Sequence, residues 1–157
     1  MFKGCYTALV TPMREDGSVD YAGLESLIEF QIANRIQGVL AVGTTGESPT
    51  LLWEEHNEVI ENTCKLARGR CVSIAGTGSN STRETLAATE HAAHVEADAV
   101  LLVDPYYNGP SSVEIRREYV EPVAREFSQL QIIPYIIPGR TGTMMHVEDL
   151  AILAQQY

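Results

Sequence analysis

The sequence is short of basic residues, cysteines and long apolar runs, and each shortage disfavours a class of protein. Lysine and arginine number 11 against 21 aspartates and glutamates, a formal charge of −10, so we expect no nucleic-acid partner. No apolar run approaches the roughly 20 residues that cross a bilayer, and the N-terminus lacks the apolar core of a signal peptide. Cys5, Cys64 and Cys71 have no CxxC spacing and are expected to be reduced thiols. These features predict a cytoplasmic protein with no membrane contact.

With 157 residues, 45% of them hydrophobic, the chain can bury the core of one domain. Short apolar runs recur about every thirty residues, each followed by a turn rich in Gly, Ser, Thr or Pro and by an amphipathic stretch. The runs are continuously apolar, which is typical of parallel strands buried on both faces. They span residues 6–10, 39–42, 72–75, 99–103 and 132–137. Residues 1–157 are therefore predicted to form a single α/β domain of five βα units without an internal boundary.

Local signals mark the starts of helices and one unusual strand. Ser81 with Glu84 and Ser111 with Glu114 have the spacing of a capping box, in which a side chain and the backbone satisfy each other's free donors. Pro134 lies inside the fifth run and lacks a backbone donor. It predicts an edge strand, a bulge or a strand start at that position.

Periodicity leaves two architectures open. Five βα units in 157 residues would make a complete flavodoxin-like doubly wound sheet, or five-eighths of a (β/α)8 barrel. Both folds place their functional residues in the loops that follow the strands.

These loops carry side chains suited to binding small anions and moving protons. Residues 43–48 and 76–81 combine hydroxyls with glycines, which let backbone N–H groups approach an anion. Tyr106 and Tyr107 follow the fourth run, and a phenol can donate and accept protons. Arg140, on a Pro-Gly-Arg-Thr-Gly turn, can hold a carboxylate through two hydrogen bonds. Each loop is equally compatible with a plain structural or surface role.

The histidines do not indicate a metal centre. All four fall on expected helices or at a helix start, and the two closest, His91 and His94, have no evident third ligand. We therefore expect neither a metal nor a separate cofactor.

Five motifs occur in order along the chain. They are Val-Thr-Pro-Met at 10–13, Gly-Thr-Thr-Gly-Glu at 43–47, Ala-Gly-Thr-Gly at 75–78, Pro-Tyr-Tyr-Asn at 105–108 and Pro-Gly-Arg-Thr-Gly at 138–142. As a set they resemble the dihydrodipicolinate synthase family, among the pyruvate-dependent class I aldolases and lyases, over essentially the whole chain. The resemblance implies a partial TIM (β/α)8 barrel made of the first five βα units of eight.

The resemblance also implies a reaction. Pyruvate forms a Schiff base with a lysine, becomes an enamine and adds to L-aspartate 4-semialdehyde, giving 4-hydroxy-tetrahydrodipicolinate for diaminopimelate and lysine biosynthesis. By match to the motifs, Tyr135 is the proton donor and acceptor, Thr45 holds the pyruvate carboxylate, and Arg140 binds the carboxylate of the aldehyde. Thr44 and Tyr107 complete a proton relay, with Tyr107 reaching into a neighbouring subunit of a homodimer or homotetramer. Hydroxyl partners suit a phenol of pKa about 10 that must exchange protons near neutrality.

The family further implies a regulatory site and close relatives. Some members bind L-lysine at the dimer interface, at positions matched here by Ser48, Trp53, His56, Asn80, Glu84 and Tyr106. N-Acetylneuraminate lyases share the chemistry and are the nearest alternative. Thr44 and Arg140 favour the synthase.

Two departures from the family pattern bear on activity. Ile136 follows Tyr135 where the family usually has Asn. The family's Schiff-base lysine lies on the sixth strand, beyond Tyr157, and neither Lys3 nor Lys65 matches it. We therefore expect an active enzyme from the intact subunit and no activity from these residues alone. An inactive remnant that serves as a binding or regulatory module is a second hypothesis, and a flavodoxin-like nucleotide binder is a third.

Overall fold

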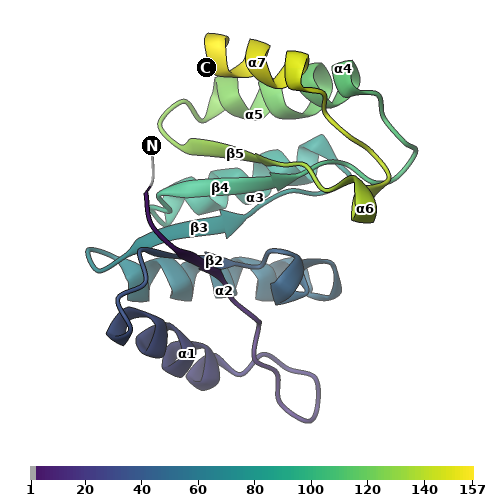
Figure 1. Cartoon of the computed structure of the whole chain (residues 1–157). Coiled ribbons are helices and arrows are strands. Elements are labelled where there is room, and N and C mark those ends of the chain that lie inside the picture. Colours follow the sequence, from purple (N-terminus) through teal and green to yellow (C-terminus); the bar gives the residue numbers. More distant parts are fainter. Residues whose placement is uncertain (1–2) are drawn as a thin grey trace.

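The computed structural model describes residues 3–157, and its strands form one parallel sheet (Figure 1). Strands pair strictly in chain order, from β1 at one edge to β5 at the other. Their bounds are β1 Tyr6–Ala8, β2 Gly38–Ala41, β3 Val72–Gly76, β4 Ala99–Val103 and β5 Gln131–Tyr135. Each predicted apolar run thus contains strand residues, and Pro134 lies on β5, the last strand of this chain, opposite Leu102 of β4.

The strand order decides between the two architectures. A flavodoxin-like sheet places its first strand between the second and the third, whereas β1 pairs only with β2 in this sheet. Sequential order with helical crossovers is the arrangement of a (β/α)8 barrel. The flavodoxin-like alternative is therefore wrong.

Helices and short helical turns connect the strands (Figure 1). The α-helices are α1 Tyr21–Ala33, α2 Trp53–Ala67, α3 Thr82–His94, α4 Ser112–Glu114, α5 Glu121–Glu126, α6 Pro138–Thr141 and α7 Val147–Gln156. Two 3-10 turns, η1 (Thr44–Gly46) and η2 (Ser48–Thr50), follow β2. A π-helical turn, η3 (Ile115–Val120), continues α4 into α5.

One of the two predicted capping boxes forms completely. At α4, the Ser111 hydroxyl accepts the Glu114 N–H, and the Glu114 carboxylate accepts the Ser111 N–H at 2.8 Å. At α3, Ser81 accepts the N–H of Glu84 at 3.4 Å. The Glu84 carboxylate instead accepts the hydroxyl of Ser79, one turn earlier in the loop. The box at α3 is therefore only half formed, and Glu84 is drawn toward the β3–α3 loop.

The core lies between the sheet and its helices. On β4, Val100 and Leu102 are fully buried and belong to this core, whereas Leu101 and Val103 point to the opposite face and are half-buried. The continuous apolar runs predicted burial on both faces. On β4, the face that carries Val100 and Leu102 is covered, and Leu101 and Val103 on the other face line a cavity.

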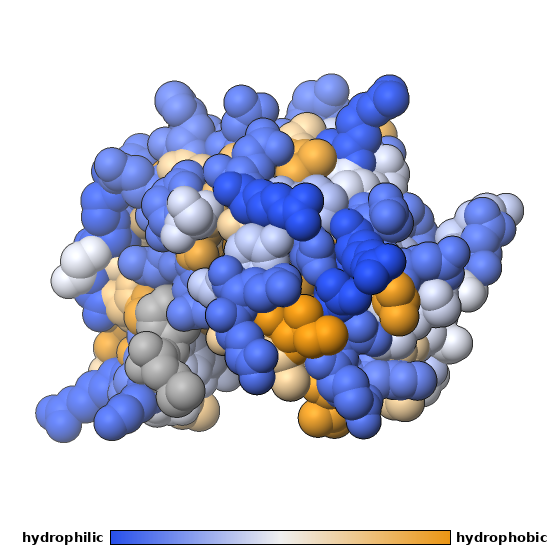
Figure 2. Space-filling model, turned by 90° about the horizontal axis from the view of Figure 1, so that it is seen from above, coloured by the Kyte–Doolittle hydropathy of each residue, from blue (hydrophilic) through white to orange (hydrophobic). Residues whose placement is uncertain are grey.

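The surface on the α7 side is mostly hydrophilic, with apolar residues in separate patches (Figure 2). Within residues 3–157, no helix combines the length and apolar character needed to cross a membrane.

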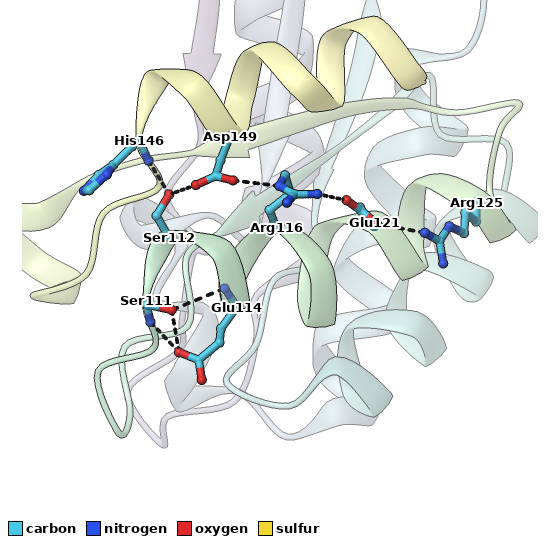
Figure 3. Close-up of polar contacts among 8 residues, drawn as sticks. All are labelled: Ser111, Ser112, Glu114, Arg116, Glu121, Arg125, His146 and Asp149. Carbon is cyan, nitrogen blue, oxygen red and sulfur yellow. Dashed lines mark hydrogen bonds and ion pairs between the residues drawn. The ribbon is translucent and has the colours of Figure 1, made fainter.

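A buried polar network joins α7 to the helix made by α4, η3 and α5 (Figure 3). The Arg116 Nε donates to Asp149 at 2.7 Å, and the same guanidinium pairs with Glu121. The Ser112 hydroxyl donates to Asp149 and accepts the backbone N–H of His146 at 2.7 Å. Hydrogen bonds from Ser112 and Arg116 hold the pKa of Asp149 below its ordinary value. The network orients the last helix against the π-helical turn.

A close backbone approach fixes the strand ends beside the cavity. A Cβ added to Gly76, the last residue of β3, would lie 2.4 Å from the carbonyl oxygen of Val42. No real Cβ tolerates that distance to a backbone atom. Only glycine therefore allows the end of β3 to lie this close to the end of β2.

We expect Asp149→Asn to lower the melting temperature at pH 7 by roughly 5 °C, because the variant leaves the Arg116 charge only partly matched. The pKa of Asp149 is lower in the folded than in the unfolded chain. The ionised Asp149 therefore stabilises the folded chain above its unfolded pKa of about 3.9. This stabilisation is lost as the pH falls through the pKa of Asp149 in the folded chain. Melting curves from neutral to acid pH should converge for the two proteins. Glu148→Gln, an exposed change on the same turn, is the control, and a gap that persists in acid would contradict this account.

The same substitution at two glycines tests the close approach. Gly76→Ala should lower the free energy of unfolding by about 1–3 kcal/mol, as overpacking does elsewhere, because the Val42 backbone must move. Gly139→Ala adds the same methyl group where nothing lies within 4 Å. Urea titration compares the two variants, and equal stability would contradict the steric explanation.

Candidate active site and an adjoining cavity

A cavity of about 540 Å³ opens at the carboxyl ends of the strands. Three of the five predicted catalytic and substrate-binding residues line it, each from a different segment: Thr44 from η1, Tyr135 from the end of β5, and Arg140 from α6. Ser48 and Tyr106, predicted for the regulatory site, line it as well. Parallel pairing of the strands therefore brings hydroxyl, phenol and guanidinium groups to the same cavity.

The other two predicted residues lie outside this cavity. Thr45, the neighbour of Thr44 on η1, is exposed and is not among the lining residues. Tyr107 is 73% exposed. It lines a separate hollow of about 340 Å³ formed with Asn80, the end of α4 and η3. Within this chain, the two hydroxyl groups do not converge with Tyr135.

The loop that carries Thr44 is held in an uncommon backbone conformation. Val42 has a φ of 46° and Glu47 a φ of 56°, and the left-handed region is strained for a β-branched residue such as Val42. The Thr11 hydroxyl donates to the Gly46 carbonyl at 2.7 Å and ties the loop to the segment after β1. Strain beside the cavity is thus held in place by buried packing and one buried hydrogen bond.

Arg140 stands on a short, rigid turn. Pro138 begins α6, and Gly142 ends it with a φ of 68°. Among residues 3–157, no carboxylate pairs with the Arg140 guanidinium, which is exposed at the cavity. Its donors are free to hold an incoming carboxylate.

A second cavity, of about 260 Å³, adjoins the first. All six residues predicted for the regulatory site line it: Ser48, Trp53, His56, Asn80, Glu84 and Tyr106. The two cavities share a wall, because both are lined by Ser48, Pro49, Gly78 and Tyr106. This grouping was predicted from the resemblance alone and depends on the way α2 and α3 pack behind the loops.

The second cavity has a neutral polar group on one side and a charged group on the other. His56 is only 2% exposed, and its ring packs edge-on to Trp53 with centroids 5.0 Å apart. Neither of its ring nitrogens makes a hydrogen bond of normal geometry within residues 3–157. Desolvation lowers the pKa of His56 to about 4, so the imidazole is neutral at pH 7. On the other side, the exposed Glu84 supplies a carboxylate, and Asn80 accepts the N–H groups of Tyr106 and Tyr107 at 2.7 and 2.9 Å.

Two buried residues near the cavities were not predicted from the sequence. Asp104 is 1% exposed, accepts the Met145 N–H at 3.3 Å, and has its pKa raised by burial. Tyr119 reaches the strand ends from η3. An acidic residue after a strand could have been noted from the sequence, but nothing in the sequence gives the direction of Tyr119.

No group of three or more histidine, cysteine or acidic side chains in the described part of the chain is arranged to hold a metal ion. His91 is half-buried and has Nε2 3.1 Å from the Asn57 carbonyl, and His94 is exposed.

Comparison with known proteins identifies the family. The model of the dihydrodipicolinate synthetase family matches residues 1–157. A 4-hydroxy-tetrahydrodipicolinate synthase of Gluconacetobacter diazotrophicus is 45% identical over 155 residues, which cover 99% of this chain and 52% of that protein. The chain thus spans about half the length of the curated relatives that it matches.

Solved structures agree in fold. Dihydrodipicolinate synthase from Acinetobacter baumannii, complexed with pyruvate, matches with a TM-score of 0.93 and 42% identity over 99% of this chain and 53% of that one. The enzyme from Cyanidioschyzon merolae with lysine bound matches with a TM-score of 0.94 and 39% identity over 99% of this chain and 52% of that one. These matches confirm the predicted partial (β/α)8 barrel of five βα units. The chain belongs to the dihydrodipicolinate synthetase family.

Proposed function

We propose that this chain forms the substrate-handling part of a 4-hydroxy-tetrahydrodipicolinate synthase, which condenses pyruvate with L-aspartate 4-semialdehyde through a Schiff base. The observation that carries the proposal is the meeting of Thr44, Tyr135 and Arg140 around one cavity at the strand ends. A hydroxyl beside a phenol suits proton transfer, and an unpaired guanidinium suits a substrate carboxylate. These are the groups that the reaction needs besides its amine.

The proposed roles follow the chemistry of each group. Tyr135 exchanges the protons of Schiff-base formation, with Thr44 as its hydroxyl partner. Arg140 holds the carboxylate of the semialdehyde. Thr45 does not line the cavity of this chain, and we assign it the carboxylate of pyruvate from the motif resemblance. Neither Lys3 nor Lys65 lines the cavity. We therefore propose that the amine comes from outside these residues and that the chain alone does not catalyse the reaction.

Tyr107 suggests that the working enzyme is a homo-oligomer. Its phenol is exposed and lies outside the cavity of its own chain. In a homodimer or homotetramer it is available to a second subunit, where it would complete the relay formed by Thr44 and Tyr135.

L-lysine is the proposed ligand of the second cavity. The relative from Cyanidioschyzon merolae was crystallised with lysine bound, and the cavity here offers one carboxylate, one amide and a neutral imidazole. Glu84 would pair with an ammonium group of lysine, and the Asn80 amide would hydrogen-bond to another polar group of the ligand.

A crossed pair of variants tests the substrate assignments. Arg140→Gln should weaken the binding of L-aspartate 4-semialdehyde by about tenfold or more, the effect of losing a charged hydrogen bond, and should leave pyruvate binding unchanged. Thr45→Val should do the reverse. Binding is measured from NMR shifts during titration with each compound, so each variant is the control for the other. If both variants bind both compounds as the wild type does, the assignments are wrong.

The only tryptophan of the chain reports on the second cavity. Titration with L-lysine should change the fluorescence of Trp53, and Glu84→Gln should weaken the apparent affinity by about tenfold because an ammonium loses its counter-charge. Glu90→Gln, an exposed change on the same helix, is the matched control. L-Norleucine, which lacks the side-chain amine, should bind poorly. No spectral change with millimolar lysine would contradict the proposed ligand.

A further inference from the structure

The Tyr119 hydroxyl joins three segments that meet at the strand ends. Tyr119 lies on η3 and is 2% exposed. Its hydroxyl donates to the carbonyl of Val103, the last residue of β4, at 3.0 Å. It also accepts the backbone N–H of Ser79 at 3.1 Å and lies 3.3 Å from the Thr85 hydroxyl, which donates to it. All the hydrogen-bonding capacity of the phenol is therefore used.

The phenol stays protonated over the physiological range. Burial raises the pKa of Tyr119 to about 12, so the proton that bonds the Val103 carbonyl remains in place. A buried hydroxyl with all its partners satisfied holds those partners in one geometry.

The held loop is part of the wall between the two cavities. A Cβ added to Gly78 would lie 2.5 Å from the Val103 nitrogen and 3.0 Å from the Tyr119 hydroxyl, so the loop packs directly on β4. Gly78 lines both cavities, Val103 the larger and Ser79 the smaller. A shift of this loop would change the shape of both spaces.

The loop in turn holds the two adjacent tyrosines. Asn80 directly follows Ser79, and its side-chain oxygen accepts the backbone N–H groups of both Tyr106 and Tyr107. A short chain of contacts thus runs from the Tyr119 hydroxyl through Ser79 and Asn80 to the loop after β4.

We propose that Tyr119 is a positioning residue, whose hydroxyl fixes the 78–80 loop and, through Asn80, the backbone of Tyr106 and Tyr107. It touches no substrate in this role. The functional consequence rests on the proposed function of the two cavities, whereas the structural consequence does not. The π-helical turn presents Tyr119 to the strand ends while Arg116, on the same turn, bonds to α7. Such turns are frequent at functional sites.

Tyr119→Phe tests the proposal by removing one oxygen atom from the full chain. The amides of Ser79, Tyr106 and Tyr107 should exchange with solvent about tenfold faster, the change expected when one hydrogen bond of the local structure is lost. Exchange is read residue by residue by NMR, and amides of α2 and β5 should keep their rates. The control is Tyr157→Phe, which also removes one phenol hydroxyl bonded to a neighbour, the Nε of Arg125 at 2.8 Å. A loss of stability alone would speed all globally exchanging amides together and would overturn the positioning role.

The variant Thr85→Val tests the positioning role of Tyr119 independently. The Ser79 N–H is shared between the Thr85 hydroxyl, at 3.0 Å, and the phenol. If Tyr119 positions the loop, this variant should retain the protection of all three amides. Loss of their protection in Thr85→Val would assign the role to Thr85 and overturn the proposal, even if Tyr119→Phe failed to fold.

Lysine titration followed by Trp53 fluorescence adds the functional readout. Tyr119→Phe should raise the apparent dissociation constant by about tenfold, and Tyr157→Phe should leave it unchanged. Failure of the wild type to bind lysine would refute the proposed ligand while the exchange result still decides the role of Tyr119. Wild-type exchange rates at Tyr106 and Tyr107 in Tyr119→Phe would refute the positioning role while the ligand assignment stands.

Discussion

Parallel pairing of consecutive strands is the constraint on which the site depends. Because β1 to β5 all run the same way and pair in order, every loop after a strand emerges at one end of the sheet. Thr44 is far from Tyr135 and Arg140 in the sequence, yet each of the three follows or ends a strand and so reaches the same cavity. One strand inserted out of order would separate them.

Small residues and strained backbone shape the region where the two cavities meet. Gly76 and Gly78 allow the ends of β3 and β4 to approach neighbouring backbone to distances that a Cβ would forbid. The left-handed backbone at Val42 and Glu47 then folds the η1 and η2 turns back over this junction. Buried partners such as Thr11 and Tyr119 hold the arrangement. The geometry at the mouth is therefore set by the backbone, and the functional side chains are attached to a rigid frame.

The sequence predicts the strands well, because a buried parallel strand requires a continuous apolar run that few other structures produce. Through the motif resemblance it names three residues that line the larger cavity and six that line the smaller one, since those residues follow strands or begin helices. It also names Thr45 and Tyr107, which lie outside the larger cavity. It does not predict contacts that depend on the angle between distant elements. The ion pair of Arg116 with Asp149, the turn of Glu84 toward Ser79 and the direction of Tyr119 belong to this class. The sequence pattern likewise does not predict that Tyr107 is exposed.

The shared wall has a thermodynamic consequence for the two ligands. Ser48, Pro49, Gly78 and Tyr106 face both spaces, so a molecule in one cavity contacts residues that shape the other. If lysine changes the affinity of the larger cavity for a substrate, that substrate must change the affinity for lysine by the same factor. A rigid wall transmits such a difference only if it has two discrete arrangements. The buried hydrogen bonds of Tyr119 oppose gradual deformation of the wall at Gly78, so coupling carried by this part of the wall requires the 78–80 loop to move as a unit.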